Sequence, residues 1–321
     1  MSRPVSCRAV VVVPTWTRPE VAARAAAAAW GQMGPDDLLM VVAQGSGEEV
    51  AATREALERT LAAAGSGAGT GGGGGGGLPE RVVLEQQPEA DRVRARNRAF
   101  TRTGCRYAVF LDDDSIPRPG WLEALLAPLE AGEAELAAGR LVEEPDRTTN
   151  AEGLTGARLT WTGHTRRDFN TPRSGPTGLA PGGNMAVRCE LARRAGGFDE
   201  AFAGATMYED VEFSLRLRRM GARAVYRGDA AVDHLALGTG SWHRLEEERW
   251  EGVRARQMSL IFRRHRPRLW PLMAFSYLAA AGWKSLIGRL SPGTVMQVAG
   301  ALKEGWGAGA RTPEPLEEEP A

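Results

Sequence analysis

Three adjacent carboxylates, Asp112, Asp113 and Asp114, follow the apolar run 108–111, which is typical of a strand covered on both faces. Side chains alternate in an extended chain, so we expect Asp112 and Asp114 to project to one side and Asp113 to the other. Two carboxylates at about 4 Å repel by roughly 4 kcal/mol at an effective dielectric constant near 20. Mg²⁺ or Mn²⁺ would relieve that repulsion, because both ions accept oxygen ligands. The alternative interpretation is an aspartate-rich turn.

An acidic pair and a histidine later in the chain are further candidates for a catalytic or metal-binding role. Glu209 and Asp210 begin a predicted helix, where carboxylates are ordinarily explained by the helix dipole. His234 follows another short apolar run, and histidine is a frequent metal ligand, although a lone histidine is usually a satisfied polar residue. By themselves these residues leave both interpretations open.

An alternating α/β architecture is predicted to position these groups. Apolar runs predict strands at 9–13, 38–43, 81–84 and 108–111, separated by helices at 19–30, at 48–64 and from 91. This rhythm predicts an open, mostly parallel sheet flanked by helices, whose ligands bind beyond the carboxyl ends of the strands. Several polar residues follow those strands: Thr15, Arg18, Gln44, the arginine cluster 92–98 and Asp112 to Asp114.

The second half of the chain is less regular. Gly182 and Gly183 precede an apolar strand at 184–187, so they predict either a close approach of a ligand to the backbone or a tight turn. The segment 143–180 lacks periodicity and predicts a long loop that is mobile or faces an acceptor. Residues 222–226 predict a strand, and a separate short apolar run precedes His234.

Composition excludes some classes of protein. The formal net charge of the 321 residues is zero, which gives no electrostatic case for nucleic-acid binding. Three widely separated cysteines show no metal-ligand spacing and favour unpaired thiols in a reducing compartment. The N-terminal residues lack a secretory signal, so we expect a cytoplasmic enzyme body. Residues 65–77 have the composition of a flexible, functionally silent linker.

The C-terminal part combines basic and apolar residues. The basic segment 263–268 precedes the apolar stretch 269–283, which is shorter than the roughly 20 residues needed to cross a bilayer. Two interpretations of this pattern are equally favoured. Residues 263–287 either attach to an anionic membrane surface or form a helix packed on the enzyme body. Residues 291–321 are expected to be a tail of low order.

Seven motifs in order resemble family 2 glycosyltransferases over residues 8–245. They are Val10–Pro19, Ala95-Arg-Asn97, Phe110–Pro117, Gly182–Val187, Gly196–Asp199, Glu209-Asp210 and Asp233-His234. The resemblance implies a GT-A fold, a nucleotide-sugar donor, Mg²⁺ or Mn²⁺ as cofactor, and transfer with inversion.

The resemblance also implies a role for individual residues. Asp112, Asp114 and His234 would hold the metal, and Asp210 would be the catalytic base. The nucleotide would be bound by Thr15, Arg18, Gln44, Arg96 and Asp112, and the donor sugar and acceptor by Gly183, Asn184, Glu209 and Trp242. Gln44 stands where the family commonly has a carboxylate, which leaves the identity of the donor base open.

The sequence therefore predicts a catalytic domain at 1–245, a helical extension at 246–290 that is either attached to a membrane surface or packed on the enzyme body, and a tail at 291–321. We expect an inverting glycosyltransferase acting on a carbohydrate, lipid-linked or small-molecule acceptor. One alternative is an inactive sugar- or nucleotide-binding protein of the same fold, but such a protein would be expected to lose the acidic residues. Another is a nucleotidyltransferase, which would need a glycine-rich phosphate loop after the first strand, where Thr15–Pro19 has no glycine.

Overall fold

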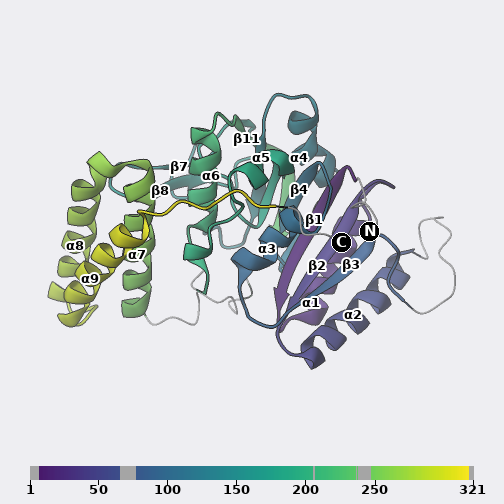
Figure 1. The fold of residues 1–321 in the computed structure, drawn as a ribbon, viewed down its shortest axis with the longest axis horizontal. Helices are drawn as coiled ribbons and strands as arrows, with labels where there is room; N and C mark the ends of the chain where they lie inside the picture. The colour runs from purple at the N-terminus through teal and green to yellow at the C-terminus, as the bar shows by residue number, and fades with distance from the viewer. Residues whose placement is uncertain (1–6, 66–76, 205–206, 236, 238–246, 318–321) are drawn as a thin grey trace.

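The computed structural model describes residues 7–65, 77–204, 207–235, 237 and 247–317. A nine-stranded sheet runs through the molecule in the order β3-β2-β1-β4-β10-β6-β11-β5, with β9 paired to β11 (Figure 1). The strands of one half are mutually parallel: β3 (Val82–Gln87), β2 (Leu38–Gln44), β1 (Ala9–Trp16) and β4 (Tyr107–Leu111). The other half contains β10 (Asn184–Arg188), β6 (Leu136–Val142), β11 (Ala224–His234), β5 (Ser115–Pro117) and β9 (Gly175–Pro176).

Strand β10 is antiparallel to both of its neighbours, β4 and β6, so the sheet is mixed. The expected α/β fold with a sheet flanked by helices is confirmed, as are the four predicted N-terminal strands and the helices between them. Strand β1 extends beyond the expected stop at Pro14. Its pairing with β4 ends at Val12, and from there β1 pairs only with β2, so a proline without an N–H is tolerated on the open side.

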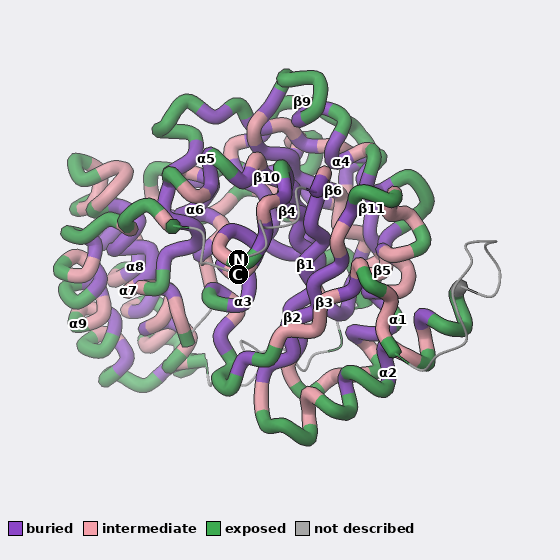
Figure 2. Tube along the Cα trace, turned by 45° about the vertical axis from the view of Figure 1, so that its right-hand side comes forward, coloured by how far each residue is buried: buried purple, intermediate pink, exposed green. Residues whose placement is uncertain are grey.

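Helices cover both faces of the sheet. Side chains of β1 alternate, with Val11 and Val13 packing toward α1 (Pro19–Trp30), α2 (Gly47–Gly65) and α4 (Trp121–Glu130). Val10 and Val12 belong to the other core, which includes α3 (Arg92–Thr101), α5 (Cys189–Arg194) and α6 (Glu209–Arg219). The central strands are buried throughout, while the outer sides of the helices are exposed (Figure 2).

Two sequence expectations for the middle of the chain are wrong. Part of the expected loop 143–180 forms a hairpin of β7 (Gly156–Leu159) and β8 (Thr165–Asp168), and β9 adds to the main sheet. The two runs before His234 form one strand, β11, whose pairing with β6 shifts register between Arg227 and Ala231. A bulge lets one strand continue across an interruption of its apolar pattern.

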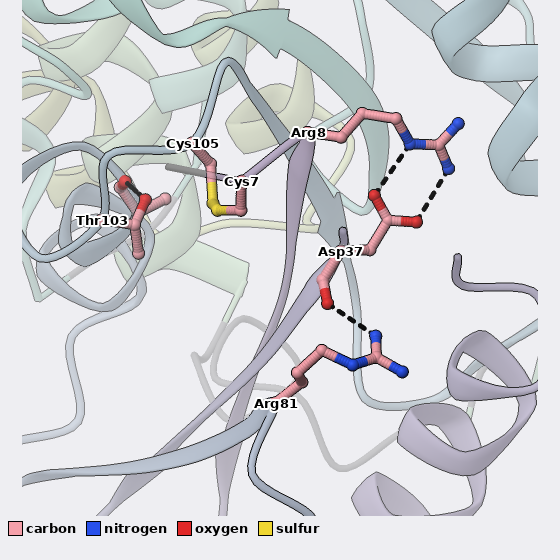
Figure 3. The surroundings of a disulfide bond; sticks show 7 residues. Cys7, Arg8, Asp37, Arg81, Thr103 and Cys105 are labelled. Atoms are coloured by element: carbon pink, nitrogen blue, oxygen red, sulfur yellow. Dashed lines mark hydrogen bonds and ion pairs between the residues drawn. A yellow bond between two sulfur atoms is a disulfide. The ribbon is translucent and has the colours of Figure 1, made fainter. Parts of the chain in front are cut away.

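The expectation of unpaired cysteines is also wrong. Cys7 and Cys105 form a disulfide that joins the chain before β1 to the chain before β4 (Figure 3). The third cysteine, Cys189, is buried and does not belong to this disulfide. Beside the disulfide, Arg8 donates two hydrogen bonds to the Asp37 carboxylate, at 2.9 and 2.7 Å. Because disulfides persist in oxidising environments, the cysteines give no support to a reducing compartment.

The C-terminal region is helical beyond the expected limit. It contains α7 (Glu247–His265), a 3₁₀ turn (Pro267–Leu269), α8 (Trp270–Leu286) and α9 (Gly293–Ala308) at one end of the molecule (Figure 1). Helix α9 lies within the tail that was expected to be of low order, because its buried side chains, including Val298 and Leu302, join the core that contains α7. Among the described residues, no helix is long and apolar enough to cross a membrane.

Candidate active site

The loop after β4 divides its three aspartates as the strand alternation predicted. Asp113 is buried and turns toward β1. It accepts a hydrogen bond from Thr15 Oγ1 at 2.8 Å and forms an ion pair with Arg18. Burial raises the pKa of Asp113 to about 6, although Arg18 opposes the rise. Thr15 and Arg18 therefore fix the acidic loop through Asp113.

Asp112 and Asp114 approach His234, at the end of β11. One ligand atom from each of these three residues lies within 4.8 Å of the others. His234 Nε2 is 3.4 Å from Asp114 Oδ1, and Arg18 Nη1 is 3.1 Å from Asp114 Oδ2. Burial acts to raise the pKa of Asp114, but His234 and Arg18 outweigh it and lower the pKa to about 2. The structure thus brings together the three predicted metal ligands.

A buried arginine connects the acidic loop to helix α6. Arg96 is 1% exposed and contacts Glu209 Oε1 at 2.8 Å and Asp112 Oδ1 at 3.2 Å. Two glycines allow this arrangement: a Cβ on Gly182 would lie 2.6 Å from Arg96 Nη1, and one on Gly183 would lie 2.3 Å from Asp112 Oδ2. The glycine pair is therefore explained by close approach of side chains to the backbone.

Asp210 lies in the first turn of α6, two residues after Tyr208, which adopts a left-handed backbone with φ 66°. Its carboxylate accepts hydrogen bonds from the backbone N–H groups of Gly182 at 2.9 Å and Val211 at 2.8 Å. Burial and the neighbouring charge of Glu209 raise the pKa of Asp210 to about 6, although these hydrogen bonds and Arg96 oppose the rise. A carboxylate with this pKa is suited to accept a proton near neutral pH.

A cavity of about 410 Å³ lies over these groups. Its lining includes the predicted site residues Arg96, Asp112, Gly183, Glu209, Asp210 and His234. Residues that the sequence did not single out also line it: Glu143, Arg147, Thr148, Thr165, Arg167 and Tyr208. Five of these lie in the segment 143–180, where the predicted acceptor-facing character was the only sign of a role in the site.

Two predicted ligand-binding residues are engaged inside the protein instead. Asn184 is completely buried: its Oδ1 accepts from Trp121 Nε1 at 2.8 Å and its Nδ2 donates to backbone carbonyls of Arg140 and Ala230. Gln44 stands at the end of β2 as predicted, but its Oε1 accepts from Asp91 N at 2.6 Å and its Nε2 donates to Thr15 O at 3.3 Å. Both side chains position neighbouring elements, and Trp242 lies outside the described residues.

Only part of the arginine cluster on α3 faces the cavity. Arg92 and Arg96 line it, whereas Arg94 pairs with Glu89 and Glu200. Arg98 likewise pairs with Glu85 at 2.6 Å. The helix has a solvated side and a cavity side, and the sequence alone did not separate the two.

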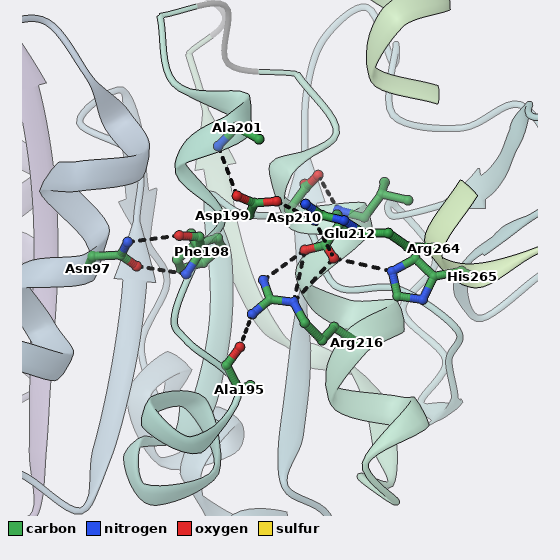
Figure 4. Close-up of polar contacts among 11 residues, drawn as sticks. Asn97, Ala195, Phe198, Asp199, Ala201, Asp210, Glu212, Arg216, Arg264 and His265 are labelled. Carbon is green, nitrogen blue, oxygen red and sulfur yellow. Dashed lines mark hydrogen bonds and ion pairs between the residues drawn. The ribbon is translucent and has the colours of Figure 1, made fainter. Parts of the chain in front are cut away.

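The core side of α6 carries a second charged cluster (Figure 4). Glu212 is fully buried and contacts Arg216 at 2.7 Å, His265 at 3.2 Å and Arg264 at 3.3 Å. Arg264 also pairs with Asp199, which caps the 3₁₀ helix Glu200–Phe202. Because Arg264 and His265 end α7, this cluster joins the C-terminal helices to the helix that carries Asp210.

Known proteins resemble this chain in sequence and in fold. The family described as Glycosyl transferase family 2 matches residues 10–196, and that described as Glycosyl transferase family group 2 matches residues 107–299. The pre-mycofactocin glycosyltransferase of Mycobacterium tuberculosis is 32% identical over 149 residues, 44% of this chain. The match spans only 29% of that relative's length.

Solved structures extend the likeness to the fold. The crystal structure of S. aureus TarS 1–349 has a TM-score of 0.58 at 14% identity, covering 93% of this chain and 80% of that one. The structure of GalNAc-T7 with UDP, GalNAc and Mn²⁺ has a TM-score of 0.55 at 13% identity, covering 80% and 48%. With a family model that matches more than half of its residues, this chain belongs to glycosyltransferase family 2, and its fold is GT-A-like.

Proposed function

We propose that the protein transfers a sugar from a nucleotide-sugar donor to an acceptor hydroxyl with inversion at the anomeric carbon, with Asp210 as the general base. The observation that carries this proposal is the placement of Asp210 on the same cavity as Asp112 and His234. Neighbours of similar fold were solved with UDP, one of them with GalNAc and Mn²⁺, which supports a nucleotide-sugar donor.

The donor set fits a divalent cation. Asp112 and Asp114 offer carboxylate oxygens, and His234 offers an imidazole nitrogen, with its Nδ1 buried and lacking a hydrogen-bond partner among the described residues. The two carboxylates are suited to Mn²⁺ or Mg²⁺. When bound, such an ion supplies a Lewis acid that stabilises negative charge on a leaving diphosphate.

The chain's own residues account for the remaining steps. Asp210 would accept the proton of the acceptor hydroxyl, while its two backbone hydrogen bonds hold the carboxylate in place. Attack from the face opposite the leaving diphosphate inverts the anomeric carbon. Arg96 balances the charge of Glu209 and Asp112 between the base and the acidic loop.

The first test is turnover of a panel of nucleotide sugars, measured as release of nucleoside diphosphate with Mn²⁺, with Mg²⁺ and with chelator. We expect one donor class to turn over and chelation to abolish the reaction. Calorimetric titration with Mn²⁺ alone should show binding to the wild type and strong loss of binding in Asp114→Asn. Absence of turnover with every donor would contradict the proposed reaction, and metal binding that survives in Asp114→Asn would contradict the ligand assignment.

A further inference from the structure

Helix α8 is apolar on two opposite sides, and only one of them is covered. Met273, Ala274, Tyr277 and Ala281 are buried in the core shared with α7. The other side exposes large apolar side chains: Leu272 (40%), Phe275 (70%), Trp283 (63%), Leu286 (79%) and Ile287 (49%). Their spacing of three, eight and three residues places the first four on one face of the helix, and Ile287 directly follows the last helical residue. We call these five side chains the α8 outer face.

An uncovered face of this kind is unusual in a water-exposed protein. Large contiguous apolar patches on soluble monomers generally mark a site that binds another protein or a membrane. The neighbouring helix α9 adds a sixth exposed apolar side chain, Met296, which is 75% exposed. We therefore expect the α8 outer face to contact another protein or a membrane.

The surrounding charges favour an anionic lipid surface. Between residues 252 and 303 the sequence contains no aspartate or glutamate, although the whole chain is neutral. Exposed Arg268 precedes α8 and exposed Arg289 follows it, with the side chain of Arg289 62% exposed and 3.5 Å from Glu247. A second copy docked face to face would bring these arginines close to one another, whereas anionic headgroups would attract them.

The geometry is that of a helix lying in the membrane plane. No described helix can span a bilayer, and α8 has 17 residues. A helix with one inserted apolar face and basic residues at its ends binds at the boundary between headgroups and acyl chains. The basic segment 263–268 contributes less than its sequence indicated, because Arg264 pairs with Asp199 and Arg266 donates to the carbonyls of Leu159 and Thr160.

We propose that the α8 outer face inserts into the surface of an anionic phospholipid membrane. This attachment would act close to the candidate active site: Tyr277, on the buried side of α8, donates a hydrogen bond to Gly163 O at 3.0 Å. Gly163 lies in the turn between β7 and β8, and residues of this hairpin line the cavity. The proposal is independent of the proposed reaction, because lipid binding can be measured without turnover.

The test is flotation of the full chain with phosphatidylcholine vesicles made with and without phosphatidylglycerol. We expect wild type to float, more strongly with phosphatidylglycerol, and Phe275→Ser/Trp283→Ser/Leu286→Ser to bind on the order of 100-fold more weakly. Arg268→Gln and Arg289→Gln should each weaken binding about fivefold, only with phosphatidylglycerol. Met220→Ser replaces a 39% exposed apolar side chain outside this face, so it controls for serine substitution itself and should bind like wild type.

Circular dichroism melting and donor turnover in solution confirm that the triple variant is folded. Two outcomes would overturn the proposal. One is a wild type that does not float with either vesicle; the other is flotation that the triple variant retains. Light scattering adds a third: a wild-type dimer that the triple variant converts to a monomer, without any flotation, would assign the face to a second copy.

Discussion

Asp210 and Glu212 stand two residues apart on α6, yet their surroundings give their carboxyl groups opposite properties. Asp210 faces the cavity, and its hydrogen-bond donors among the described residues are backbone N–H groups. Burial and Glu209 raise its pKa to about 6. Glu212 faces the core, where burial also acts to raise its pKa, but His265 and Arg216 outweigh burial and lower it to about 2. The same helix thus carries a carboxylate prepared for proton transfer and one that serves as an anchor.

The difference teaches that cationic partners, rather than burial, separate the two roles. Both carboxylates lose solvent, and desolvation alone would raise both pKa values. Arg216 and His265 provide hydrogen bonds and charge that stabilise ionised Glu212. The cation that opposes the pKa shift of Asp210 is Arg96, which is already engaged by Glu209 and Asp112. Four predictions test this contrast.

Replacing the cavity carboxylate should have the largest effect, and on activity alone. We expect Asp210→Asn to lower the turnover rate by roughly 10²- to 10⁴-fold, because the amide cannot accept the acceptor proton. Its melting temperature should equal or slightly exceed that of wild type. The folded pKa of Asp210 lies above its ordinary value, so ionisation of this group opposes stability as the pH rises through about 6. Unchanged turnover would exclude Asp210 as the base.

Replacing the core carboxylate should act on stability instead. Glu212→Gln removes the partner of Arg216, Arg264 and His265, and loss of one member of a buried charge cluster costs about 3–5 kcal/mol. Urea unfolding measures this loss. The control Glu55→Gln changes a carboxylate that is 81% exposed and should have almost no effect. Equal stability of the two variants would contradict an anchoring role.

A smaller loss of stability is expected when only one cation of the core cluster is removed. His265→Gln removes the imidazole contact with Glu212 but leaves the ion pairs of Glu212 with Arg216 and Arg264 in place. We expect a loss of about 1–3 kcal/mol in urea unfolding, the range for a hydrogen bond to a charged group. A loss equal to that of Glu212→Gln would show that His265 is indispensable to the cluster, which would contradict shared stabilisation.

The smallest expected change concerns the pH dependence of activity, which should follow the ionisation of Asp210. Because Asp210 must be ionised to act as a base, kcat/KM should fall as the pH decreases through about 6. Glu209→Gln removes a neighbouring negative charge and frees Arg96 from its pairing with Glu209, and both changes favour ionised Asp210. The acidic limb of the pH profile should therefore move to lower pH. A limb that stays at the wild-type pH would assign it to another group.

The sequence predicted the parallel half of the sheet well because each strand there is a continuous apolar run ended by turn residues. It missed the continuity of β11, which depends on pairing with β6, a strand distant in sequence. It also missed the β7–β8 hairpin, whose two four-residue strands are too short and too polar to give an apolar pattern. It also missed α9, whose glycines and exposed polar residues concealed a narrow buried stripe. In each of these segments, packing and strand pairing in the folded chain decided the secondary structure, because the local sequence has only a weak preference for a helix or a strand.

The sequence by itself determined which residues could do chemistry: three aspartates after an apolar strand, an acidic pair at the start of a helix, and a histidine after a strand. Tertiary structure alone decided their neighbours. It directed Asp113 toward Thr15 and Arg18, engaged Asn184 and Gln44 in internal hydrogen bonds, and gave Glu212 cations from α7 that Asp210 lacks. The physical reason is that pKa and availability depend on groups brought close by folding, and a residue's type and spacing do not specify those groups.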